Sequence, residues 1–321
     1  EIPKRDWSSD VCSSDLITVG SFRLSMLDSV EVIRSVEQLS DTAVIVLPGS
    51  VFNKAIEVEQ KIKRGDKVVI NLGYDGNLVR EFDGYLDSIS TDDGSIKLNC
   101  EDSLYLLKQP VADKEFINPD ISDILKYIAG SFTVVCDYSF RYDKYVIKGQ
   151  TAYQVLKKLQ EETKANIYLK ESVLHVHPQY SELFGSASYS FQDNIEKSSL
   201  QYKNAEDRKL IVNAEGKGKD GKVIRETVGE SGGDSITLRI DGVSDRATLR
   251  NLATEQLKVK SYTGYSGSFT GWLIPFCDAA YKIYLDDADY NFKSGAYYVL
   301  EVRTKVSRSG GEREIKIGKR L

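Results

Sequence analysis

Histidine, methionine and tryptophan are scarce in this chain of 321 residues, which has two histidines, one methionine and two tryptophans. Histidine is the side chain that most often serves as a general base near neutral pH and as a zinc ligand. Two copies therefore leave little room for either chemistry. The sequence also has no run of about 18 consecutive apolar residues, which excludes a membrane-spanning helix.

Charge and composition are those of an ordinary globular chain that is slightly acidic. Hydrophobic residues make up 41% and charged residues 28%, and the net charge is −5. An acidic chain is a poor candidate for a nucleic-acid binder, because such binders neutralise phosphates with lysine and arginine. At about 150 residues per domain, the length predicts roughly two domains.

Residues 1–16 have the sequence EIPKRDWSSDVCSSDL and show neither helical nor strand periodicity. They resemble the translated read-through of a sequencing adapter, and we treat them as an artefactual leader outside the fold. Cys100, Cys136 and Cys277 then remain, widely spaced and without a CxxC motif. An odd number at such spacing predicts free, buried thiols rather than disulfides or a zinc site.

Residues 17–110 have the pattern of a first β-barrel module. Val68, Ile70 and Leu72 fall on one face of a strand, and Ile96, Leu98 and Cys100 repeat the alternation further along. A period of two predicts half-buried antiparallel strands, and regular glycine turns between them suggest a barrel or sandwich. Residues 42–47 form a nearly continuous apolar run, which predicts a strand covered on both faces.

Residues 111–180 have the pattern of a compact α+β module. Asn118-Pro119-Asp120 can cap a helix, in which Ile121, Ile124, Leu125 and Ile128 follow at helical spacing before Gly130. A second helix over about 151–164 carries a buried stripe of Ala152, Val155, Leu156 and Leu159. Residues 167–169 and 173–176 are predicted to form a hairpin.

Residues 181–321 are predicted to form a second β-barrel module with one helix over about 245–258. The glycine-rich segment 216–221 lies between two strands and contains Asp-Gly, so it predicts a hairpin tip rather than a phosphate loop. Tyr298, Leu300, Val302 and Val306 mark one face of a long late strand. Residues 313–317 then return after the turn at Ser309-Gly310-Gly311.

His175 and His177 are the first of two weak candidates for chemistry. The two histidines share a strand face with Glu171, but no further histidine completes a zinc site. Exposed strand residues are therefore the favoured interpretation.

The second candidate is the acidic cluster of Asp286, Asp287, Asp289 and Asn291, which lacks the glycine and closing glutamate of a calcium-binding EF-hand loop. Paired carboxylates for glycoside hydrolysis are conceivable in this cluster or at Asp92 and Asp93, but solvated loops are the favoured interpretation. GxSxG and P-loop motifs are missing. We therefore predict no catalytic residue, cofactor or metal.

The order of several soft motifs resembles the baseplate hub, or late control D, group of contractile-tailed phages, which is related to the spike-hub protein of type VI secretion. The motifs are VEVIRS at 30–35, LSDTAVIVLP at 39–48, GDKVVI at 65–70, GYDG at 73–76, FDGYL at 82–86, CEDSLYLLK at 100–108, GAYYVLEV at 295–302, GG at 310–311 and REIKIG at 313–318. The resemblance covers about residues 21–321.

This resemblance implies a structural protein with two tail-tube-like antiparallel barrels and an intervening α+β region. It implies a homotrimeric ring that adapts a hexameric tail tube to a trimeric spike, with other baseplate proteins around it and DNA passing through without specific binding. The expected location is the virion tail, assembled in the bacterial cytoplasm. The chain ends soon after the last strand pair, which favours a phage or prophage tail with a separate spike.

The basic C-terminal region is the candidate docking surface. Two interpretations of this region compete: its basic residues belong to a solvated strand pair, or they form a docking surface for an acidic partner. The candidate strand pair consists of Tyr297, Val299, Glu301, Arg303, Arg313 and Lys316.

Two alternative functions remain open from the sequence. One is a type VI or related contractile-injection hub. The other is a secreted glycan-binding or glycan-cleaving β protein, in which some of the 19 tyrosines would form an exposed aromatic row in one cleft. A hub instead predicts tyrosines dispersed through cores and interfaces.

Overall fold

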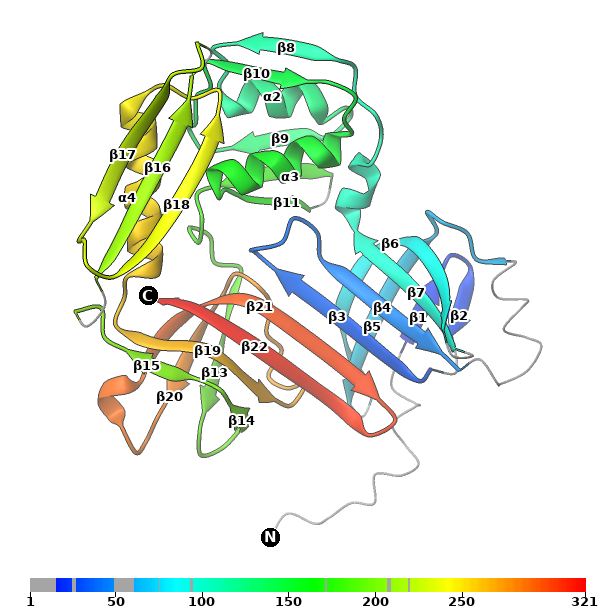
Figure 1. Ribbon diagram of the computed structural model, residues 1–321. Helices are drawn as coiled ribbons and strands as arrows, with labels where there is room; N and C mark the ends of the chain where they lie inside the picture. Colours follow the sequence, from blue (N-terminus) through cyan, green and yellow to red (C-terminus); the bar gives the residue numbers. More distant parts are fainter. Residues whose placement is uncertain are drawn as a thin grey trace.

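The computed structural model describes residues 16–24, 27–48, 61–74, 76–92, 95–170, 172–206, 209–218 and 220–321. Strands predominate and form two β modules, one from each end of the sequence, with an α+β region joined to both (Figure 1). The predicted mainly β fold with an α+β insert is confirmed. The predicted leader lies outside the described residues, except Leu16, which pairs with Asn71 and is therefore part of the fold.

In the described residues, the first β module contains seven strands and a short 3-10 helix. These elements are β1 (Leu16–Val19), β2 (Phe22–Leu24), β3 (Ser29–Ser35), β4 (Thr42–Leu47), β5 (Lys67–Tyr74), β6 (Asn77–Asp92), β7 (Ser95–Asp102) and η1 (Ser103–Leu107). Val68, Ile70 and Leu72 are buried in its core together with Leu98 and Cys100, as the alternation predicts. Antiparallel pairing with one apolar face explains this burial.

Strand β4 differs from its prediction. Ala43, Ile45 and Leu47 are buried, whereas Val44 and Val46 are only half-buried on the opposite face. The continuous apolar run therefore does not mark a strand covered on both sides. β4 is a central strand between β3 and β7 that belongs to a sheet with one core face.

The second β module contains the last two strands of the chain, which are also among its longest. Its elements are β13 (Gly185–Ser190), β14 (Ile195–Ser198), β15 (Gln201–Lys203), β19 (Gly264–Gly271), β20 (Tyr281–Asp286), η2 (Asn291–Lys293), β21 (Gly295–Ser307) and β22 (Gly310–Arg320). Its ladders are antiparallel apart from the parallel pair β13–β20. Its core contains Tyr189, Phe269, Ile283, Val302 and Ile315.

The two β modules share one sheet. β21 pairs with β22 on one side and with β3 on the other, and the register runs from Glu301 opposite Ser35 to Ser307 opposite Ser29. Figure 1 shows this contact at the centre of the molecule, where the red strands meet the blue ones. Residues far apart in the sequence thus hold the modules edge to edge, and β3 and β21 leave no free strand edge between them.

The α+β region contains three small sheets and three helices in the described residues. Its elements are β8 (Lys114–Ile117), α2 (Ile121–Ile128), β9 (Thr133–Cys136), β10 (Lys144–Ile147), α3 (Ala152–Thr163), β11 (Asn166–Lys170), β12 (Val173–His177), β16 (Leu210–Lys217), β17 (Val223–Gly229), β18 (Asp234–Asp241) and α4 (Arg246–Lys260).

Local sequence signals explain where the first two of these helices begin and where α2 ends. Asp120 and Asp123 form a capping box at the start of α2, and Gly130 follows its end with a φ of 60°. Thr151 caps α3 by accepting a hydrogen bond from the backbone N–H of Gln154. Such caps satisfy amide groups that have no partner inside the helix, and each stabilises a helix by about 1 kcal/mol.

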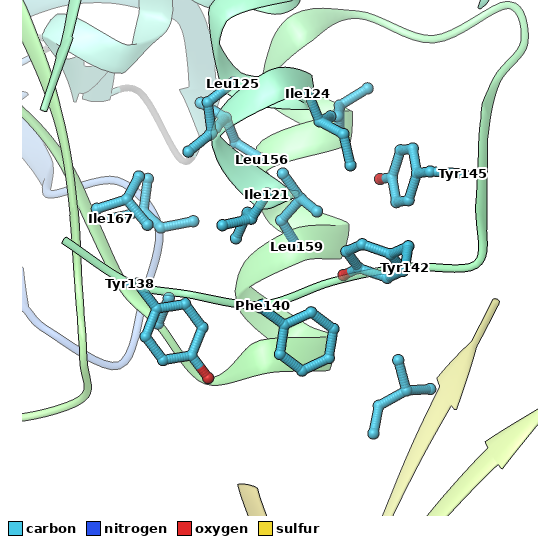
Figure 2. Packing of buried hydrophobic residues seen from close by; sticks show 14 of the residues in the cluster. Ile121, Ile124, Leu125, Tyr138, Phe140, Tyr142, Tyr145, Leu156, Leu159 and Ile167 are labelled. Carbon is cyan, nitrogen blue, oxygen red and sulfur yellow. The ribbon is translucent and has the colours of Figure 1, made fainter. Parts of the chain in front are cut away.

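An aromatic ladder fills the core between α2, α3 and the strands. Figure 2 shows Tyr138, Phe140, Tyr142 and Tyr145 beside the apolar faces of the two helices. The ring centroids of Phe140 and Tyr142 lie 5.0 Å apart, as do those of Tyr142 and Tyr145. Edge-on and tilted contacts at this distance add to the stabilisation from buried area.

The boundary of the α+β region differs from the prediction. Strands β16, β17 and β18 and helix α4 were predicted to belong to the second β-barrel module of 181–321. Val212, Leu238 and Leu249 instead belong to the same core cluster as Ile121 and Leu156. Strand and helix patterns indicate which face is buried but not which other element covers it, so this grouping was not visible in the sequence.

We predict that Leu249→Ala destabilises all of the α+β region together. Leu249 is fully buried in α4, and truncating such a leucine costs about 2–5 kcal/mol. Hydrogen exchange should become faster in residues 111–180 and 209–260 and stay slow in β3 and β21. The exposed neighbour Arg250→Ala is the control. Faster exchange confined to 209–260 would show that this part has its own core.

Candidate functional site

The predicted docking strand pair has one outer face that carries charges of both signs. Arg303 lies 3.5 Å from Glu31 of β3 and 3.8 Å from Glu301. Lys316 lies 2.7 Å from Glu37. Glu301, Arg303 and Lys316 are thus placed together on the solvent side of the seam between the modules. Such partly exposed pairs contribute little to stability.

Tyr297, Val299 and Arg313 are buried, which corrects the expectation that they lie on that face. The ladder between β21 and β22 shifts register between Tyr297 and Val299 and again between Val299 and Glu301. Each extra residue in a strand reverses the alternation beyond it. Tyr297 and Val299 consequently point into the second core, while Tyr298 and Leu300 pack on the opposite face against Tyr180.

Arg313 belongs to a buried ion network between the modules. Its guanidinium bridges to Glu81 of β6, whose other carboxylate oxygen lies 2.9 Å from Arg34 of β3. The side chains of Arg313, Glu81 and Arg34 are only 1%, 2% and 8% exposed. Thr304 of β21 also donates a hydrogen bond to Glu81, at 3.3 Å. One carboxylate therefore contacts side chains from β3, β21 and β22.

The loop after β19 completes this network. Arg313 donates hydrogen bonds to the carbonyl oxygens of Leu273 and Pro275, and Arg34 lies 3.1 Å from the carboxylate of Asp278. The Phe276 ring lies about equally far from both guanidinium groups, 5.1 Å from Arg34 and 5.0 Å from Arg313. Burial alone lowers the pKa of Arg34, but the charges of Asp278 and Glu81 outweigh this effect and raise it.

Sequence reasoning missed Arg34, Glu81 and Asp278. A signal for Arg34 was present, since it continues the alternation of Val30 and Val32, which face the core. Arg313 likewise alternates with Ile315 and Ile317. A charge on an apolar face indicates a buried partner, but strand pattern alone does not identify that partner.

His177 is buried, contrary to the prediction of exposed strand residues. Its Nδ1 atom lies 2.7 Å from Asp137, and its Nε2 atom lies 3.1 Å from Glu182. His175 stacks on Tyr168 at 4.8 Å, and burial together with His177 lowers the pKa of His175. These contacts attach the segment after β12 to the α+β region, and Glu171 lies outside the described residues.

The acidic cluster has a structural role in the turn before β21. Asp287 is buried, accepts a hydrogen bond from the Tyr265 hydroxyl and accepts another from the backbone N–H of Tyr290. Asp289 accepts a hydrogen bond from Gln192. The side chains of Asp92 and Asp93 lie outside the described part of the chain. Of segment 216–221, Gly216 and Lys217 end strand β16 and pair with Ile224 and Val223 of β17, just before the hairpin turn. A side chain at Gly216 would clash with the carbonyl oxygen of Val243.

The described residues offer little reactive chemistry. Burial raises the pKa of both Cys100 and Cys277 to about 12, so these thiols stay protonated and weakly nucleophilic. No group of three histidine, cysteine, aspartate or glutamate side chains in the described part of the chain is arranged to hold a metal ion. None of the described helices is long and apolar enough to cross a membrane.

The fold is that of phage tail proteins, and it is shared with a component of a bacterial secretion system. No protein family model and no curated protein sequence matches the chain. Among solved structures, it is similar to a tail protein from Neisseria meningitidis, with a TM-score of 0.65 and 15% identity over 95% of this chain and 96% of that one.

Two further structures show the same likeness. The 43 kDa tail protein of prophage MuSo2 from Shewanella oneidensis has a TM-score of 0.63 and 14% identity over 95% of this chain and 98% of that one. The E. coli type VI secretion component c3393 has a TM-score of 0.59 and 8% identity over 95% and 76%. At these identities the likeness defines the fold, and it extends over nearly the whole chain.

We predict that Arg313→Met lowers the free energy of unfolding by about 3–5 kcal/mol, because it leaves the buried Glu81 with one charged partner fewer. Chemical denaturation measures the change. Arg308→Met is the matched control, since the bridge from Arg308 to Asp28 is exposed and its loss should cost less than about 1 kcal/mol. Equal losses in the two variants would contradict a structural role for the buried network.

Proposed function

We propose that this protein is a structural hub of a phage or prophage tail baseplate. In this proposal three copies form a ring that adapts a hexameric tail tube to a trimeric spike, with other baseplate proteins around it. The observation that carries the proposal is the whole-chain fold likeness to two tail proteins and to a type VI component.

The arrangement of the two β modules supports a ring of three. Each chain contributes two modules, so three chains present six, which matches a sixfold tube without six copies of the gene. One heterologous contact, repeated until it closes, is enough to build such a ring. The β3–β21 pairing fixes the two modules relative to each other, which regular spacing around a ring requires.

The charge balance supports passage of DNA without specific binding. The net charge of −5 gives no excess of cations to hold phosphates. On this proposal the channel at the centre of the ring conducts DNA from tube to spike. The ring is assembled in the bacterial cytoplasm and becomes part of the virion tail.

The distribution of tyrosines favours a hub over a glycan-binding protein. Eight tyrosines are buried among the described residues, and they lie in different cores, such as Tyr142 in the α+β region and Tyr189 in the second module. A lectin would gather them in a row along one open cleft. A contractile-injection hub of the type VI kind remains an alternative because c3393 shares the fold, and neighbouring genes distinguish the two systems.

We predict that the purified protein forms a trimer at high concentration or with its cognate spike. We expect the ring contact to include the outer face of β21, so Arg303→Glu should shift the native mass from trimer to monomer. The control is Arg239→Glu, because Arg239 is also a strand arginine paired with a glutamate, Glu215, but lies on β18.

Native mass spectrometry and analytical ultracentrifugation measure both variants, and their melting temperatures verify folding. A stable dimer under all conditions would rule out the ring. Dissociation caused equally by Arg239→Glu would place the contact elsewhere or indicate a general charge effect.

A further inference from the structure

A cavity of about 420 Å³ lies where the α+β region meets the second β module. Its walls come from the end of α4, from β16 and β18, and from β15, β19 and β22. This volume falls in the range of small-ligand pockets, about 300–1,000 Å³. Because elements of both regions line it, a ligand there would contact both at once.

Lysine dominates the charge of this cavity. Lys203, Lys260, Lys316 and Lys319 line it, against two acidic residues, Glu37 and Asp234. Lys316 lies 2.7 Å from Glu37 and neutralises it. Although burial raises the pKa of Glu37, its hydrogen bond to Lys316 and the charges of Lys316 and Lys260 lower it overall. Glu37 therefore stays ionised, and the described residues that line the cavity carry a net positive charge.

The ammonium group of Lys319 is partly buried without a negatively charged partner among the described residues. Burial lowers the pKa of Lys319. In the part of the chain that the structure describes, no carboxylate lies within salt-bridge distance of Lys319. Lys203 donates its hydrogen bond to the neutral hydroxyl of Ser266, at 3.0 Å. An anion in the cavity would stabilise both ammonium groups, because opposite charges favour the ionised form.

The remaining surface of the cavity is partly apolar. Val259 of α4, Leu300 of β21 and Ile317 of β22 line it and are otherwise buried. An inorganic ion would leave this surface without a partner. A peptide with carboxylates and an apolar side chain would contact both kinds of wall.

We propose that this cavity binds a short acidic peptide segment of a partner protein. The lysines bind its carboxylates, and the apolar wall holds a side chain between them. The proposal does not rest on the ring, since it uses only residues inside one chain. Lys260 also lies in the last turn of α4, where a cation offsets the helix dipole. Of the three lysines outside that helix, Lys316 is paired with Glu37, so the experiment targets Lys203 and Lys319.

The probe is a fluorescent, acetylated Glu-Glu-Leu-Glu-Glu amide, with a Gln-Gln-Leu-Gln-Gln peptide as its neutral match. Fluorescence anisotropy at about 50 mM salt, where screening is moderate, should give a Kd of about 100 µM or tighter for the acidic peptide. The double variant Lys203→Met/Lys319→Met should weaken binding about tenfold or more. Methionine is close to the lysine stem in length and volume but lacks the charge, so packing should change little.

Lys305→Met is the control, because Lys305 lies on the outer face of β21 beside Glu31 and not in the cavity. Binding by Lys305→Met should stay within about twofold of the unchanged protein. The proposal is overturned if the acidic peptide does not bind or if the neutral peptide binds equally well. It is also overturned if the Lys305→Met control loses as much binding as the double variant Lys203→Met/Lys319→Met. Competition by inorganic phosphate as strong as by unlabelled peptide would show a simple anion site instead.

Discussion

The buried carboxylate of Glu81 is the contact on which the arrangement of the two β modules depends. It lies between Arg34 of β3 and Arg313 of β22 and accepts a hydrogen bond from Thr304 of β21. Removing such charges from water is costly, and the cost is offset only when every charge keeps its partners. A shift of β21 along β3 would separate these groups. We therefore regard the network as a device that fixes the register of the shared sheet.

Packing contacts connect this network to the rest of the described molecule. The seam joins strands from both ends of the sequence, and the α+β region packs against the second module through Tyr180 and Val259. Among the described thiols, Cys100 and Cys277 are buried, whereas Cys136 is half-buried, contrary to the prediction. The buried side chains of Asp287 and His177 have hydrogen-bond partners. These contacts hold the surfaces of the described regions at fixed distances from one another.

Much of the local structure could be predicted from the sequence, because it depends on neighbouring residues. Asp120, Thr151 and Gly130 determine helix ends, and the alternation at Val68, Ile70 and Leu72 identifies a buried strand face. The site was harder to predict, because bulges at Val299 reverse the faces of β21 and because the partner of Arg313 is 232 residues away. The prediction also assigned β16 to the second β module, whereas the structure packs it in one core with α2. No local pattern in the sequence identifies which element covers an apolar face.

Hydrogen exchange at the β3–β21 ladder is the most direct test of this account. Alternate amides of residues 29–35 and 301–307 are directed between these two strands, and the others bond to β4 or β22. If the modules form one rigid sheet, both sets should exchange as slowly as the module cores and open only with global unfolding. Fast exchange at the amides between β3 and β21, with both cores still protected, would show that the modules separate and would contradict the account.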